Sequence, residues 1–144
     1  MPKKVIIFIS LLLLFVAQPA QLQDDPAAEP LLTVMQIMTA IITPMTATIW
    51  GAYELQTDAE WLEIENAALT VIAAGNLLTS GGASDAEQAA ASEADWLTYN
   101  NQMIAAARAV ITAVGQKDEE ALFAAGNDAL YPPCESCHQQ YQQQ

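Results

Sequence analysis

Thr57-Asp58-Ala59-Glu60 opens the stretch that decides the fold, TDAEWLEIENAALTVIAAGNLL, which runs to Leu78. Thr57 and Glu60 have the spacing of a capping box, in which each side chain binds the other's backbone N–H at a helix start. The apolar residues that follow recur at helical spacing and predict one buried face: Trp61, Ile64, Ala68, Val71 and Ile72. This stretch therefore predicts an amphipathic helix that ends near Leu78.

A second helical pattern precedes this stretch. Pro30 suits the first turn of a helix, because its missing N–H costs nothing there. A helix is therefore predicted from Leu31 to about Leu55, with Pro44 inside it as the expected position of a kink. Its apolar stripe is Met35, Met38, Ile42, Met45 and Ile49.

Two more helical patterns follow. The segment from Thr79 to Ser84 predicts a break. A third helix is expected from about Asp85 or Ser92 to Val114, ended by Gly115, and its inward side chains would be Trp96, Met103, Ala107, Val110 and Ile111. A fourth begins near Lys117-Asp118 and continues to the C-terminus, with an interruption at Pro132-Pro133. Four helices with short connections predict an all-α, antiparallel up-down-up-down four-helix bundle.

The fourth pattern contains the only cysteines and the only histidine of the chain, in the order Cys134-Glu135-Ser136-Cys137-His138. A C-x-x-C-H sequence is typical of c-type haem attachment. The two thiols, of Cys134 and Cys137, would form thioether bonds to the porphyrin, and His138 would ligate the iron. The sequence thus predicts one covalent haem c per chain, near the C-terminal end of the bundle.

Three other interpretations of this motif are weaker. A redox dithiol usually accompanies a βαβ pattern, which the sequence lacks. Structural zinc usually has four protein ligands, and no further cysteine or histidine is available. A disulfide would close a loop of only two residues, with little entropic benefit.

The N-terminus indicates export. Lys3 and Lys4 precede an apolar stretch from Val5 to Ala17 that is short for a membrane span, which is typical of a signal peptide over residues 1–20. An uncleaved anchor is the alternative. Residues 21–30 would be a polar lead-in and residues 31–144 a four-helix-bundle cytochrome domain. Since c-type haem is attached outside the cytoplasm, a bacterial periplasmic location is expected.

The mature chain would be strongly acidic. Cleavage would leave Arg108 and Lys117 as the only basic residues against 17 acidic ones. Such a surface repels nucleic acid and could attract a basic partner, or it could serve solubility alone. No stable membrane span is expected once the signal peptide is removed.

The exported helical pattern with a C-terminal C-x-x-C-H motif resembles the class II cytochromes c, the cytochrome c prime family. The supporting residues are Thr33 to Met38, Pro44, Ile49-Trp50, Glu60-Trp61, and Cys134 to His138 followed by Tyr141. The resemblance covers essentially the whole mature chain. The chain departs from the family pattern at Pro132-Pro133. It also lacks a basic residue after the motif, where family members often place a cation near the haem propionates.

The resemblance implies that Cys134 and Cys137 carry the thioethers and that His138 is the proximal iron ligand. In the low-spin branch of the family, a methionine of the first helix fills the distal position; Met38 is the better match here and Met35 the second choice. The implied function is single-electron transfer with a redox partner protein. The alternative is NO or CO binding at an open distal site lined by residues such as Leu32, Met35 or Ile42. A homodimer is also implied.

An enzymatic function has little support. The chain has no second histidine, no nucleophile beside a base and no motif for a second cofactor. Glu60, Glu63 and Glu65 resemble a solvated helix face rather than an acid–base pair. We therefore expect a non-enzymatic haem protein.

Overall fold

All regular structure in residues 29–142, the part of the chain that the computed structural model describes, is helical. The predicted signal peptide and nearly all of the polar lead-in lie outside this range. No helix within residues 29–142 is long and apolar enough to cross a bilayer. The elements, in order, are α1 Val34–Ile37, η1 Met38–Ile42, α2 Thr43–Trp50, α3 Asp58–Leu78, α4 Asp85–Ala91, α5 Ala94–Gln116, α6 Glu119–Phe123, η2 Ala124–Leu130 and α7 Tyr131–Tyr141.

The long helix α3 forms as the sequence predicts. The Thr57 hydroxyl accepts a hydrogen bond from the Glu60 N–H, and the Glu60 carboxylate accepts one from the Thr57 N–H at 2.7 Å. Trp61, Ile64, Ala68 and Val71 are buried, which confirms the predicted inner face, and Ile72 is half-buried at its edge. The helix ends at Leu78, where the prediction placed its end.

The first helical stretch starts later than Pro30. Thr33 caps it, in a capping box with Gln36. The stretch passes through the π-helical segment η1 before Pro44, and it ends at Trp50 rather than near Leu55. The prediction of Pro30 in the first turn is therefore wrong, because the Thr33–Gln36 box provides the stronger start signal.

The third pattern is divided into two helices. Ser84 and Glu87 form another capping box that starts the short α4. The longer α5 begins at Ala94, and it passes through Gly115 to Gln116. Lys117 then adopts the left-handed conformation, with φ of 51°, so the prediction that Gly115 ends the helix is wrong.

The last helical stretch starts at Glu119, close to the predicted start near Lys117-Asp118, and the Asp118 side chain caps it. It continues through η2 into α7, and Pro132 and Pro133 lie in the first turn of α7. The expected interruption of the helix at these prolines is therefore wrong, because the helix continues through them. A π-helical segment precedes them, as one also precedes Pro44.

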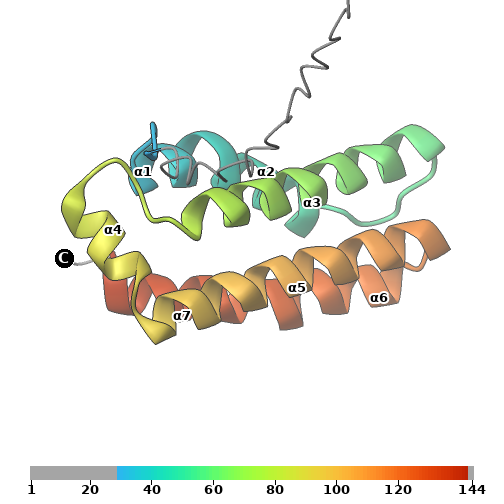
Figure 1. Cartoon of the computed structure of the whole chain (residues 1–144). Coiled ribbons are helices and arrows are strands. Elements are labelled where there is room, and N and C mark those ends of the chain that lie inside the picture. The colour runs from blue at the N-terminus through green and yellow to red at the C-terminus, as the bar shows by residue number, and fades with distance from the viewer. Residues whose placement is uncertain (1–28, 143–144) are drawn as a thin grey trace, which may run out of the picture.

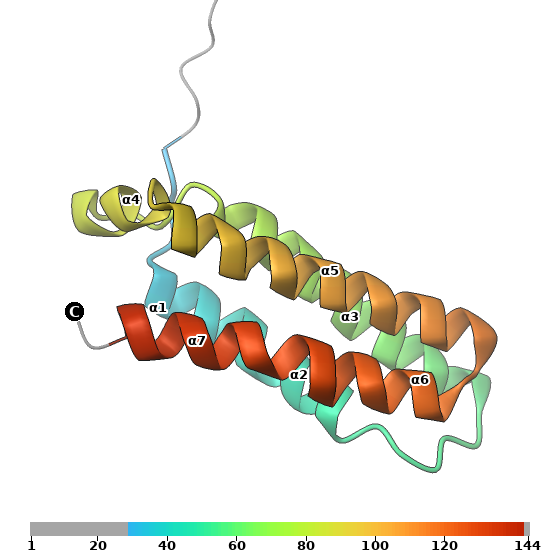
Figure 2. The ribbon, with the colours of Figure 1, turned by 90° about the horizontal axis from the view of Figure 1, so that it is seen from below.

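The long helices pack side by side (Figure 1). α3 packs against α5 and α2, while α5 packs against η2 and α7. Seen from below, α7 lies alongside α5, and the C-terminal end of α7 is at the same end of the molecule as α1 (Figure 2). Ala68, Val71, Ala107 and Val110 of α3 and α5, each fully buried, form the centre of the core.

Candidate functional site

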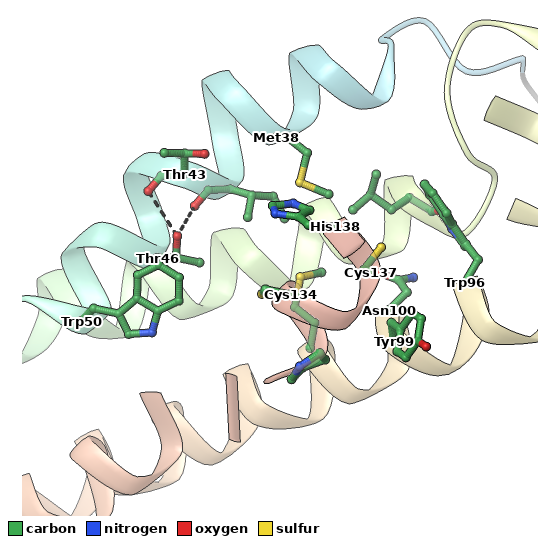
Figure 3. A pocket seen from close by; sticks show the side chains of 14 residues that line it. Met38, Thr43, Thr46, Trp50, Trp96, Tyr99, Asn100, Cys134, Cys137 and His138 are labelled. Carbon is green, nitrogen blue, oxygen red and sulfur yellow. Dashed lines mark hydrogen bonds between the residues drawn. The ribbon is translucent and has the colours of Figure 1, made fainter. Parts of the chain in front are cut away.

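A cavity of about 150 Å³ is bordered by α7 and α5, by the stretch from η1 to α2, and by the end of α3. Most of its walls are apolar or aromatic. Its lining consists of Met38, Ile42, Thr43, Thr46, Trp50, Leu78, Trp96, Tyr99, Asn100, Met103, Pro133, Cys134, Cys137 and His138. The side chains from these separate elements converge on one space (Figure 3).

Helix α7 contributes the predicted attachment residues. Cys134 and Cys137 are three residues apart in a continuous helix, so their side chains lie on one face. His138 follows on the same side and also lines the cavity. Both thiols are half-buried and free, while the imidazole is exposed at the rim.

The environment keeps the thiols neutral. Burial, with a smaller effect from the neighbouring Cys137, raises the pKa of Cys134 to about 11. Burial also raises the pKa of Cys137. Neither arginine nor lysine lines the cavity to stabilise a thiolate. At neutral pH this wall therefore presents two thiols rather than thiolates.

The two methionines that the sequence singled out differ in position. Met38 is half-buried and lines the cavity from η1. Met35 is 63% exposed and does not line the cavity. Leu32, proposed with Met35 and Ile42 for an open distal site, is also exposed and outside the lining, whereas Ile42 is part of it.

A third methionine lines the cavity from α5. Met103 is 5% exposed, and its terminal methyl packs at Gly75 of α3, where an added Cβ would lie 3.2 Å from it. Its thioether is therefore held in the contact between α3 and α5. Met38 is the more accessible thioether of the two.

The aromatic walls are fixed by hydrogen bonds. The Trp50 indole N–H donates to the Gly126 carbonyl at 2.9 Å, and the Trp96 indole N–H donates to the Leu78 carbonyl at 2.8 Å. Trp96 also meets Tyr141 edge to face, with ring centroids 5.1 Å apart. Of the three tryptophans, Trp50 and Trp96 thus border the cavity, whereas Trp61 packs in the core.

Tyr141 ties the end of α7 to the start of α5. Its hydroxyl donates to Glu93 at 2.9 Å. Partial desolvation, the hydrogen bond to Glu93 and the negative charge of that carboxylate together raise the pKa of Tyr141 to about 12. A protonated tyrosine therefore holds the motif-bearing helix against α5 at any ordinary pH.

Asn100 is the most buried polar side chain of the lining after Thr46. Its amide nitrogen donates to the Gly75 carbonyl at 2.8 Å and to Thr79 at 3.3 Å. Its Oδ1 is the one buried side-chain polar atom in the described part of the chain that lacks a partner. An unpaired buried acceptor costs about 1–3 kcal/mol, so this wall would be stabilised by a hydrogen-bond donor.

Sequence reasoning missed the polar lining. Trp96, Tyr99, Asn100 and Met103 are spaced i, i+3, i+4 and i+7 on α5, and Thr43, Thr46 and Trp50 are spaced i, i+3 and i+7 on α2. These spacings place each set on one helix face, which could have identified them. That the two faces meet α7 at one cavity depends on tertiary packing.

Residues 29–142 contain no group of three or more histidine, cysteine, aspartate or glutamate side chains arranged to hold a metal ion. Cys134, Cys137 and His138 thus border one space without forming such a cluster. The chain matches no protein-family model, no curated protein and no solved structure.

Proposed function

We propose that this protein is an exported c-type cytochrome that carries single electrons. The observation that carries the proposal is the convergence on one apolar cavity of both thiols, the single imidazole and the Met38 thioether. The C-x-x-C-H motif assigns the first three of these groups to one haem, and the resemblance to class II cytochromes c assigns Met38 to it.

The residues present fit a covalent haem. Thioether formation joins each sulfur to a porphyrin carbon rather than to the metal, so it requires two thiols facing one space and no preformed metal cluster. Cys134 and Cys137 meet that requirement from one helix face. The remaining walls are apolar and aromatic, as a largely apolar cofactor requires.

His138 would be the proximal ligand, and Met38, which lines the same cavity, would be the distal one. When bound, haem supplies an iron that alternates between the ferrous and ferric states. Methionine and histidine ligation favours electron transfer, because it raises the reduction potential and leaves no open position for a substrate. Met35 is a poorer candidate because it faces solvent, and Met103 because its methyl packs against Gly75.

We further propose that the helices form the expected up-down-up-down four-helix bundle. The stretch from α1 to α2 would be the first long helix, α3 the second, α5 the third, and the stretch from α6 to α7 the fourth. The packing of α3 on α2 and α5, and of α5 on α7, supports this arrangement. The short α4 would belong to the connection between the second and third helices.

Export to the bacterial periplasm belongs to the same proposal. Its support is the N-terminal sequence and the need to attach haem outside the cytoplasm. The acidic composition supports a basic redox partner. A homodimer remains an expectation from the resemblance to class II cytochromes c.

The test is expression of the full chain in a bacterium that attaches c-type haem. We expect exported protein whose haem stays bound after denaturation, and one haem per chain by mass. Replacing Cys134 and Cys137 together with serine should abolish the covalent haem. Ser136→Ala, a change within the same motif, is the matched control and should retain it.

Absorption spectra of the ferric and ferrous forms then separate electron transfer from gas binding. A low-spin ferric spectrum without a rapid response to CO or NO supports the electron carrier. A high-spin ferric spectrum with rapid CO or NO binding would replace that proposal with a gas-binding function. Protein that lacks covalent haem under these conditions would contradict both.

A further inference from the structure

An aromatic pair leads from the cavity to the surface. The Trp50 ring lines the cavity at the end of α2. It meets Tyr131, at the start of α7, edge to face, with ring centroids 6.1 Å apart and an interplanar angle of 67°. Trp50 is 38% exposed and Tyr131 is 50% exposed. One ring therefore borders the proposed haem site, and both reach solvent.

The pair is held in place rather than free to reorient. The indole N–H of Trp50 donates to the carbonyl of Gly126 in η2 at 2.9 Å. An added Cβ at Gly126 would lie 3.7 Å from the indole Cδ1, so the backbone of η2 approaches the ring closely. α2 and η2 thus fix the indole, and Tyr131 contacts it through the edge of its ring.

Acidic residues neighbour Tyr131 along its helical stretch. Glu135 lies four residues after Tyr131 on α7, which places both side chains on one helix face, and Asp128 precedes Tyr131 in η2. Both carboxylates are exposed. α2, η2 and α7 contain no lysine or arginine. Of the basic residues in the described part of the chain, Lys117 is paired with Asp58, and Arg108 is exposed on α5, which packs against η2 and α7. An exposed apolar centre with an acidic rim fits a partner that presents cations around an apolar patch.

We propose that the Trp50–Tyr131 pair is the contact at which a cationic one-electron redox protein docks and exchanges electrons with the cavity. This inference rests on the proposed haem function. In the oxidising direction the haem iron would go from ferrous to ferric, and the redox centre of the partner protein would accept the electron. No bond is formed or broken, and no proton moves. The aromatic rings shorten the through-space part of the electron-transfer path, and the acidic residues near Tyr131 orient the partner.

Oxidation of the ferrous, haem-loaded protein tests the proposal in stopped flow. The probe is tris(1,10-phenanthroline)cobalt(III), a cationic oxidant with aromatic faces, and ferricyanide is the anionic comparison. Tyr131→Leu should slow the cobalt reaction about three- to fivefold, the range of a lost exposed cation–π contact. Tyr131→Phe should retain the rate. Leu69→Ala, which removes an exposed apolar side chain from α3, is the matched control.

The charge contribution is tested by Glu135→Gln, with Glu63→Gln on α3 as its control. Only the first should slow the cobalt reaction at low salt, and the difference should vanish near 0.5 M salt, where the Debye length is only about 4–5 Å. Oxidation by ferricyanide should not slow in either variant. Equal effects of the two substitutions would assign the rate to net charge and overturn the docking site.

Binding provides a readout that does not depend on electron transfer. The cobalt complex is diamagnetic and cannot oxidise the ferric protein, so it can be titrated against that form by NMR. The indole N–H signal of Trp50, assigned with Trp50→Phe, should shift on addition of the complex, and the shift should weaken in Tyr131→Leu.

The two proposals fail in different ways. Absence of covalent haem contradicts the proposed function before any kinetics are measured. Haem-loaded Tyr131→Leu protein that keeps the full cobalt rate and an unchanged Trp50 signal contradicts the docking contact alone.

Discussion

At the scale of single residues, the proposed distal ligand depends on the difference between Met35 and Met38. The two lie three residues apart, and a regular α-helix would put both on one face. They nevertheless differ in exposure: Met35, in the first turn of α1, is exposed, whereas Met38, at the start of η1, lines the cavity. The Met38 N–H still bonds the Val34 and Met35 carbonyls, and the wide π-helical turn follows it, so it is their places along the stretch that separate the two methionines.

The Met38→Ala substitution should convert the haem-loaded protein from a low-spin to a high-spin ferric form. Alanine offers no sulfur, and the position opposite His138 would be left without a strong ligand. Met35→Ala is the matched control, and its spectrum should not change. An unchanged spectrum in Met38→Ala would assign the distal ligand to another residue, and Met103→Leu would then be examined in the same way.

At the scale of elements, capping boxes determine where the helices begin. The same arrangement recurs at Thr33–Gln36, Thr57–Glu60 and Ser84–Glu87. In the third box the Glu87 carboxylate also accepts the Val34 N–H at 2.8 Å. The start of α4 is thereby bonded to the start of α1, which holds the stretch that carries Met38.

The Thr57→Ala substitution should destabilise the fold by about 1 kcal/mol, because it removes the side chain that caps α3. For a domain of this size we expect the melting temperature to fall by about 4 °C. Thr98→Ala is the control: this exposed threonine lies inside α5 and bonds only to the Ala94 carbonyl of its own helix. Its replacement should leave the melting temperature nearly unchanged, and equal losses in both variants would contradict the capping role.

The caps also predict how stability depends on pH. Hydrogen bonds from the Gln56 N–H, the Thr57 hydroxyl and the Thr57 N–H lower the pKa of Glu60, and the Lys117 hydrogen bond and charge lower that of Asp58. A lowered pKa in the folded state stabilises the protein above the pKa of the unfolded chain, and this contribution is lost as the pH falls through the folded value. The melting temperature should therefore decrease below about pH 4, and less so in Glu60→Gln.

Two glycines in long helices should respond oppositely to alanine. A Cβ at Gly75 would lie 2.6 Å from Ile104 Cγ1, because α3 and α5 approach closely there, whereas a Cβ at Gly115 would meet nothing within 4 Å. Gly115→Ala should stabilise the protein by about 0.5–1 kcal/mol through helix propensity. Gly75→Ala should destabilise it by about 1–2 kcal/mol through overpacking. Denaturant unfolding measures both, and stabilisation by Gly75→Ala would contradict the close contact.

Much of the helical pattern could be predicted from the sequence, but the π-helical segments could not. α3 follows the predicted bounds because a strong cap and a regular stripe act together. Across η1, the buried residues Ile37, the last of α1, and Ile42 are five apart, a spacing outside the 3.6-residue period; in η2, Ala125 and Leu130 are also five apart, with the buried Gly126 between them. Proline cannot donate to the carbonyl four residues earlier and clashes with it. The wider turns before Pro44 and Pro132 let the helical path continue.

The candidate site could likewise be predicted from the sequence only in part. The motif residues and Met38 could be identified from local sequence, because their chemistry depends on spacing. The spacing of Asn100, Tyr99 and Thr46 could place them on one face of their helices, but not in the cavity, because that depends on how α5 and α2 pack around α7. The Trp50–Tyr131 contact joins residues that are far apart in the chain, and no local pattern indicates it.

At the scale of the whole molecule, the dominant feature is uncompensated negative charge. The chain has a formal net charge of −13, and the described residues form one ion pair, between the exposed side chains of Lys117 and Asp58. An exposed pair contributes little to stability. The acidic surface must therefore act mainly through its long-range field, which salt screens.

That field should make the reduction potential of the haem-loaded protein depend on salt. Reduction adds an electron to a molecule that is already strongly negative, so the acidic surface favours the ferric form. Two unit charges about 15 Å apart in water interact by about 0.3 kcal/mol, and the surplus of carboxylates multiplies this. Screening removes most of it, because the Debye length falls from about 30 Å at 0.01 M to about 10 Å at 0.1 M. The midpoint potential should rise by tens of millivolts over this range in a spectroscopic redox titration at pH 7. Sucrose at matched osmolarity, which does not screen charge, should leave it unchanged, and a potential that falls with salt would show that local cations rather than the acidic surface determine it.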